Sequence, residues 1–172
     1  MDALKTILHE LGSFLESGGL ERIYISTALA PAPREADEVV CHEFPVLQFV
    51  LEGQLPLTIV EVDGARREKM IGAKEGYFSL PEAWNVRSYA TARRMLAVNF
   101  RRETPDVALT CWSPGNERGK NRLWYPLPRG TTPILGALLQ ALLSLGRQEC
   151  AQQETRAATI ANAILEQVFW DL

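Results

Sequence analysis

Apolar residues at the start of the chain recur with the spacing of a helix. They follow Asp2, which is a suitable helix cap, and the pattern ends at Gly18 and Gly19. The recurring positions are Leu4, Ile7, Leu8, Leu11, Phe14 and Leu15. The sequence therefore predicts a short amphipathic helix within residues 1–18.

Residues 22–101 have the texture of a β-rich region. Short apolar runs such as RIYIST, FPVLQFVLEG, LPLTIVEVDG and RMLAVNF alternate with turn residues at regular intervals, which favours an antiparallel β-sandwich or barrel. Pro31 and Pro33 cannot donate to a strand ladder, so the stretch around them is predicted as a loop or edge. The sequence Val62-Asp63-Gly64 predicts a hairpin turn.

The last third of the chain divides into a connection and a helical segment. We predict a loop-rich connection over residues 102–131, because prolines and glycines interrupt it. Thr132 as a cap and Pro133 at the first helical position predict a helix from Pro133 to about Leu145, which Gly146 stops. A final helix is predicted from about Gln153, so that residues 132–172 form a helical segment.

The helix predicted from Pro133 is apolar nearly all round and should therefore be covered on two sides. One stripe can pack on the β-region, and the opposite stripe needs a partner, which predicts a homodimer. The stripe that we expect at the exposed dimer seam consists of Leu135, Leu138, Leu139 and Leu142.

Length and charge limit the class of protein. A chain of 172 residues suits one well-packed domain, and the net charge of −3 lacks the basic character of a phosphate-binding surface. We therefore expect that this chain does not bind nucleic acid directly. No signal-peptide core and no apolar run near the ~20 residues of a membrane span is visible, so we expect a cytoplasmic protein without membrane contact.

The familiar sequence motifs of catalysis are missing from this chain. No nucleophile elbow, Walker-type loop or dinucleotide fingerprint occurs. Cys41 and His42 are neighbours on a predicted strand and should point to opposite faces, which argues against a nucleophilic pair. Cys41, Cys111 and Cys150 show neither disulfide nor zinc-site spacing and are expected as free thiols. We therefore expect no enzymatic activity and no catalytic residue.

Two runs about 25 residues apart, VLQFVLEGQ and EGYFSLPEAWNV, resemble the half-motifs of the cupin barrel, with Gly53, Gly76 and Pro81 at the turn positions. The later RMLAVNFRR, a variable region and two helices, the first of them leucine-rich, resemble the N-terminal half of bacterial AraC-type transcription regulators (the AraC/XylS family). The resemblance implies a mainly β fold, a cupin-like antiparallel barrel of jelly-roll type. A short N-terminal helix and two C-terminal helices would accompany it.

The cupin metal ligands have no counterpart in this chain. The glutamate slot of the first motif falls on Val46, the histidine slot of the second falls on Val86, and only His42 lies near another slot. One ligand of about four cannot hold a metal, so no metal or other cofactor is expected. His42 is expected as an ordinary residue at the barrel rim, and His9 as a solvated residue of the first helix.

The family slots also predict which side chains line the barrel. If Val46 and Val86 point inward, strand alternation adds Gln48, Val50 and Ser88. On the closing strand we expect Met95, Ala97 and Asn99 to face the cavity, because Leu96, Val98 and Phe100 suit packing against helices. Tyr24 and Trp84 could border the mouth, or could simply pack in the core. The predicted ligand-binding residues are Tyr24, Val46, Gln48, Trp84, Val86, Ser88, Met95 and Asn99.

Buried amides such as those of Gln48 and Asn99 need hydrogen-bond partners, since leaving one without costs about 1–3 kcal/mol. Those partners could be each other, water or a ligand. Arg87 alternates with Val86 and Ser88 and is therefore expected outside the barrel. Without an inward cation, the lining suits a small, mostly uncharged organic effector.

AraC-type regulators bind DNA with two helix-turn-helix motifs that follow the helical linker. This chain ends where those motifs would begin, so we expect the natural protein to continue beyond Leu172 and to bind DNA only through that C-terminal domain. The implied function is effector sensing and dimerisation. A metal-independent cupin-type enzyme, isomerase-like, and a stand-alone small-molecule-binding module remain the alternatives, because a fold alone does not decide function.

Overall fold

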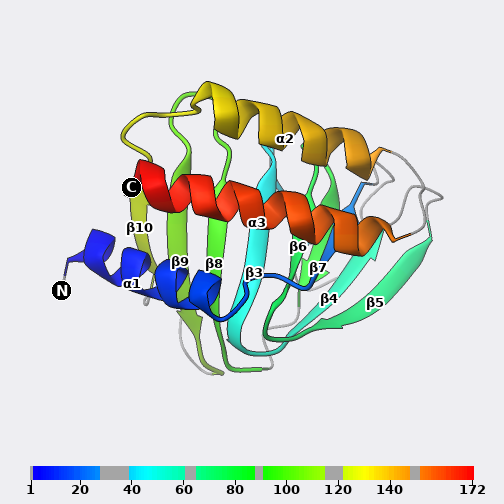
Figure 1. Cartoon of the computed structure of the whole chain (residues 1–172). Coiled ribbons are helices and arrows are strands. Elements are labelled where there is room, and N and C mark those ends of the chain that lie inside the picture. The colour runs from blue at the N-terminus through cyan, green and yellow to red at the C-terminus, as the bar shows by residue number, and fades with distance from the viewer. Residues whose placement is uncertain (1, 28–38, 61–64, 88–90, 115–121, 148–151) are drawn as a thin grey trace.

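The computed structural model describes residues 2–27, 39–60, 65–87, 91–114, 122–147 and 152–172 (Figure 1). The helices are Ala3–Glu16 (α1), Pro133–Gly146 (α2) and Gln153–Asp171 (α3). The strands are Arg22–Ser26 (β1), Val39–Cys41 (β2), Val46–Gly53 (β3), Leu55–Val60 (β4), Arg66–Ile71 (β5), Glu75–Ser79 (β6), Trp84–Arg87 (β7), Arg93–Asn99 (β8), Asp106–Trp112 (β9) and Arg122–Pro126 (β10).

Helices α1 and α2 begin where their capping residues predict. The Asp2 carboxylate accepts a hydrogen bond of 3.1 Å from the backbone N–H of Leu4, and the Thr132 hydroxyl accepts one of 3.3 Å from that of Leu135. Pro133 occupies the first helical position of α2, where its missing N–H costs nothing. All three helices expected from the sequence are therefore confirmed.

The described strands form two sheets. One has six strands in the order β1-β6-β3-β8-β9-β10, and the other has four in the order β2-β7-β4-β5. The mainly β character with flanking helices is confirmed. The two sheets are not closed into one barrel, so the cupin jelly roll is not confirmed, and the pairing of β1 with β6 is parallel, unlike the all-antiparallel arrangement that we expected.

The segment 102–131, expected as a loop-rich connection, instead carries strands β9 and β10. Pro105 immediately precedes β9, and Pro126 is the last residue of β10, so these two prolines do not interrupt a strand. The Val107 to Leu109 stretch supplies the apolar centre of β9, where all three residues are buried. The turn expected at 62–64 and the loop around Pro31 and Pro33 lie outside the described residues.

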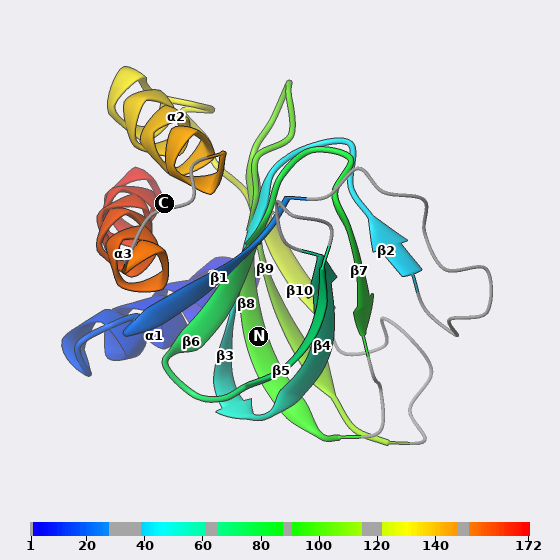
Figure 2. The same cartoon turned by 90° about the vertical axis from the view of Figure 1, so that its right-hand side faces the viewer.

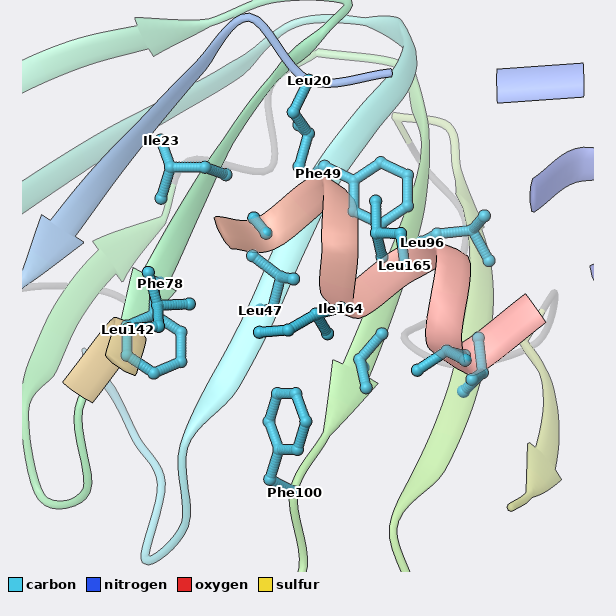
Figure 3. Close-up of a cluster of buried hydrophobic side chains, with 14 of the residues drawn as sticks. Leu20, Ile23, Leu47, Phe49, Phe78, Leu96, Phe100, Leu142, Ile164 and Leu165 are labelled. Atoms are coloured by element: carbon cyan, nitrogen blue, oxygen red, sulfur yellow. The ribbon is translucent and has the colours of Figure 1, made fainter. Parts of the chain in front are cut away.

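All three helices cover the same face of the six-stranded sheet, and the four-stranded sheet lies on its other side (Figures 1 and 2). Leu47 and Phe49 of β3 and Leu96 of β8 point from the sheet toward α3, where Ile164 and Leu165 meet them (Figure 3). Each of these five side chains is at most 1% exposed. This apolar layer fixes the helices on the sheet, because burying such side chains stabilises a fold by about 1.5–3 kcal/mol each.

A polar tie holds α3 to the segment between α1 and β1. The side-chain oxygen of Asn162 accepts a hydrogen bond of 2.7 Å from the Leu20 N–H, and its amide nitrogen donates one of 2.9 Å to the Leu20 carbonyl. Gly19 has a φ of 65°, and a Cβ at this position would collide with the Asn162 side chain. Glycine here permits both the left-handed backbone and the close approach of α3.

The prediction that the leucine stripe of α2 is exposed at a dimer seam is wrong. Leu135 and Leu142 are fully buried, and Leu138 and Leu139 are half-buried against the same core. They face inward because α2 packs on α3 and on the end of the sheet, where Gly146 lies close to Leu80 and Ile25. The exposed side of α2 instead presents Ile134, Ala137, Ala141 and Ser144.

Candidate functional site

The face of the six-stranded sheet that points away from the helices is here called the inner face. Pairing across the sheet places one residue from each strand in a single row on this face, namely Tyr24, Tyr77, Gln48, Ala97, Ala108 and Trp124. The neighbouring positions Val46 and Asn99 oppose each other, as do Val50 and Met95. The strand alternation therefore predicted correctly which residues of β3 and β8 face away from the helices.

Between the two sheets lies a second apolar core. It contains Tyr24, Val50, Tyr77 and Met95 from the six-stranded sheet and Leu55, Leu57, Ile59 and Ile71 from the four-stranded sheet. Each of these side chains is at most 6% exposed. Tyr24, Val50 and Met95 are thus core residues here, which favours the packing alternative for Tyr24 over a place at an open mouth.

Gln48 finds its partner within the chain. The Tyr77 hydroxyl, directly opposite on β6, donates a hydrogen bond to the side-chain oxygen of Gln48. Gln48 is 8% exposed and Tyr77 is fully buried, so the bond is nearly free of competition from water. The Gln48 oxygen is therefore satisfied without a ligand.

Asn99 also has a partner that the sequence did not reveal. Its amide nitrogen donates a hydrogen bond of 2.6 Å to Oδ1 of Asp106, the residue opposite it on β9, and Nε of Arg101 donates one of 2.6 Å to Oδ2. Asp106 is 6% exposed, so its charge is held by these two donors. The pairing of Asp106 with Asn99 was missed because residues 102–131 were expected to form a loop-rich connection, and a loop residue has no predictable cross-strand partner.

A charged cluster closes the inter-sheet core beside α3. Arg22 lies 3.4 Å from the Tyr24 hydroxyl and from Glu154 of α3, and 3.7 Å from Glu75. The hydrogen bond with Tyr24, followed by the negative charges of Glu154 and Glu75, raises the pKa of Arg22 above its usual value. Lys69 stacks on the Tyr24 ring at 4.7 Å and reaches Glu154 at 3.7 Å. Strands β1, β5 and β6 and helix α3 are thereby linked.

The inward position expected for Val86 on β7 is wrong. Val86 pairs with Thr58 and Val39, whereas position 87 pairs with Leu57, whose side chain belongs to the inter-sheet core. Val86 therefore lies on the outer face of the four-stranded sheet, because a shift of one residue exchanges the faces of a strand. Position 87, which was expected outside, is paired with Leu57 and so stands at an inner position of β7.

Trp84 belongs to the same outer face and does not border the inner face. It is 3% exposed and packs with Val39 and Val86, with the Arg66 guanidinium 5.4 Å from its ring centre. Ser88, the remaining expected ligand residue, lies outside the described residues. Of the expected site, the structure thus places Tyr24, Val46, Gln48, Met95 and Asn99 on one face of the six-stranded sheet.

A cleft of about 440 Å³ opens at the β10 edge of the inner face. We call it the β10 cleft, and its lining residues are Arg101, Thr104, Asp106, Arg122, Trp124 and Pro126. A second cleft of about 750 Å³ adjoins it, shares Arg101 and Thr104 with it, and extends to Glu43 and Phe44.

Among the described residues, no three His, Cys, Asp or Glu side chains gather where they could hold a metal ion. His42 is half-buried, with its ring 5.7 Å from that of Phe44, and His9 is exposed on α1. Cys41 and Cys111 are free and exposed. None of the helices in the described part of the chain has the length and apolar character needed to cross a membrane.

Comparison with known proteins yields no assignment: no protein-family model and no curated protein matches this chain.

Proposed function

We propose that this chain is the effector-sensing and dimerising domain of an AraC-type regulator of transcription, and that it has no enzymatic activity. The observation that carries the proposal is that the two faces of the six-stranded sheet bury different kinds of groups. All helices pack on one face, while the other face buries the uncharged polar groups of Gln48, Tyr77 and Asn99 among apolar side chains. A sparse set of polar groups on an apolar wall is typical of a small-molecule site.

The order of elements supports the same reading. A helix precedes the strands and two helices follow them, as in the resemblance drawn from the sequence. In this proposal the two sheets correspond to the two layers of a cupin-like jelly roll, a fold that is built from a double sheet. The effector would enter between the sheets and replace either Gln48 or Tyr77 as the hydrogen-bond partner of the other. A small organic molecule with hydroxyl or carbonyl groups fits these uncharged donors and acceptors.

The proposed homodimer uses the exposed side of the helical segment. Ile134 of α2 is 60% exposed and Trp170 of α3 is 77% exposed. The two residues lie at the same end of adjacent helices, since Thr132 and Asp171 approach to 3.5 Å. DNA would be bound by a helix-turn-helix domain that follows this chain in a cytoplasmic protein.

The decisive test is the reading frame beyond residue 172. The proposal predicts about 100 further residues, the size of a small domain, with two helix-turn-helix patterns. A stop codon directly after residue 172 would contradict the regulator and leave a metal-independent enzyme or a stand-alone binding module as the alternatives.

A further inference from the structure

The β10 cleft has the size and composition of a binding site in its own right. Its volume of about 440 Å³ falls in the range of small-molecule sites, roughly 300–1,000 Å³. Its lining comes from β9, β10 and the segment 101–104, and it lies at the opposite edge of the inner face from Tyr24. The cleft is thus separate from the Gln48 and Tyr77 pair.

One wall of the cleft is a cation held in a fixed position. The Arg101 guanidinium bonds through Nε to the Asp106 carboxylate and stacks on the Phe44 ring at 4.7 Å. Asp106 is in turn fixed by Asn99 at 2.6 Å. Arginine has five N–H donors, and this pairing occupies only the one on Nε, so the terminal nitrogens of Arg101 are left to bind another acceptor.

The other wall combines a second cation with an exposed ring. Arg122 and Trp124 are two residues apart on β10 and share the inner face, opposite the small residues Thr110 and Ala108. Trp124 is 59% exposed, and Arg122 forms no ion pair with any residue in the described ranges. Among the described residues that line the cleft, two are arginines and one is an aspartate, so the described part of the lining carries one positive charge in excess.

We propose that the β10 cleft binds a small organic acid with a flat ring. The carboxylate accepts hydrogen bonds from Arg122 and from the terminal nitrogens of Arg101, and the ring stacks on the Trp124 indole. Guanidinium groups suit this role because their planar forks match a carboxylate, and an exposed indole offers a flat apolar face. The site goes beyond the proposed sensing function, since it uses neither Gln48 nor Tyr77 and stands whether or not the protein regulates transcription.

The test uses three probes that differ in one property each. Nicotinate has a flat ring and a carboxylate, nicotinamide has the same ring without the charge, and cyclohexanecarboxylate has the charge without a flat ring. Each is titrated into the whole protein while the indole N–H signals of the tryptophans are followed by NMR. The Trp124→Leu variant identifies the signal of Trp124.

The proposal predicts that nicotinate shifts the Trp124 signal saturably and binds at least about tenfold more tightly than nicotinamide. Arg122→Gln should weaken nicotinate by about tenfold to a hundredfold and leave nicotinamide unchanged. Trp124→Leu should abolish the preference for nicotinate over cyclohexanecarboxylate, which calorimetry measures because this variant lacks the Trp124 signal. Arg156→Gln, which changes an exposed residue of α3, a helix on the opposite face of the six-stranded sheet, serves as the matched control and should have no effect.

Three results would overturn the proposal. The first is a Trp124 signal that does not move at millimolar nicotinate. The second is equal binding of nicotinate to the wild type and to Arg122→Gln. The third is a Trp124 signal that shifts with protein concentration in the absence of any probe, because β10 is an edge strand and its exposed ring would then be a contact between copies of the chain.

Discussion

The amide of Asn99 and the carboxylate of Asp106 face each other across strands β8 and β9 and are joined by a hydrogen bond of 2.6 Å. Both residues are at most 6% exposed. A buried carboxylate that loses a donor is costly, since hydrogen bonds to charged groups contribute about 1.5–3 kcal/mol. The pair therefore links the inner face to the segment that leads into the β10 cleft.

Asn99→Ala should lower the free energy of unfolding by about 1.5–3 kcal/mol, because Asp106 then keeps Arg101 as its remaining donor. Urea unfolding followed by circular dichroism measures the change. Gln140→Ala, at an exposed position of α2, should change it by less than about 0.5 kcal/mol. A double-mutant cycle of Asn99→Ala with Asp106→Ala that shows no coupling would contradict the pairing.

Tyr77→Phe should destabilise the protein by about 1–2 kcal/mol, because it removes the hydroxyl that donates to the buried Gln48 oxygen and leaves the ring in place. Tyr125→Phe is the matched control, since Tyr125 is half-buried on the helix side of β10 and its hydroxyl forms no hydrogen bond within the described chain. Equal midpoints of thermal unfolding for the two variants would show that the Gln48 bond contributes nothing to stability.

Asn162→Ala should destabilise the protein by about 1–3 kcal/mol, because both backbone groups of Leu20 lose their partner. Asn162→Asp retains the acceptor for the Leu20 N–H and should cost less. Hydrogen exchange of the Leu20 amide provides a local measurement, and faster exchange is expected in the alanine variant. Unchanged exchange would mean that α3 is not tied to this segment.

The burial of the α2 stripe determines which substitutions in α2 should disrupt the fold and which should leave it intact. Leu142→Glu places a charge in the core and should prevent folding, whereas Ile134→Glu changes an exposed side chain and should leave the fold intact. If the exposed side of α2 forms the proposed dimer, Ile134→Glu converts a dimer into a folded monomer in light scattering. A wild-type protein that is monomeric at high micromolar concentration would contradict the dimer.

Local features of the fold could be predicted from the sequence because they depend on residues close together in the chain. Asp2 and Thr132 start their helices through hydrogen bonds that span two or three residues, and Pro133 occupies the first position of α2. The alternation of β3 and β8 likewise assigns Gln48 and Asn99 to one face, since it needs only the apolar pattern of each strand.

Pairing between distant strands could not be predicted in the same way. The face on which Val86 lies depends on the register between β7 and β4, and a slip of one residue exchanges it for position 87. The partner of Asn99 lies on β9, which the sequence did not predict because the prolines around it indicated a loop. The burial of Leu135 and Leu142 depends on where α3 packs, and an apolar surface all round α2 does not reveal that direction.

The binding of a small molecule between the sheets is measured most directly by comparing dissociation constants for the wild type and Gln48→Ala. Compounds are first selected from a library of small metabolites by thermal shift, and their affinities are then determined by calorimetry. We predict that Gln48→Ala weakens at least one compound by more than about tenfold, or roughly 1.4 kcal/mol, while Arg122→Gln in the β10 cleft does not. Compounds that bind equally well to the wild type and Gln48→Ala, or that the protein converts into a product, would contradict an effector site on the inner face.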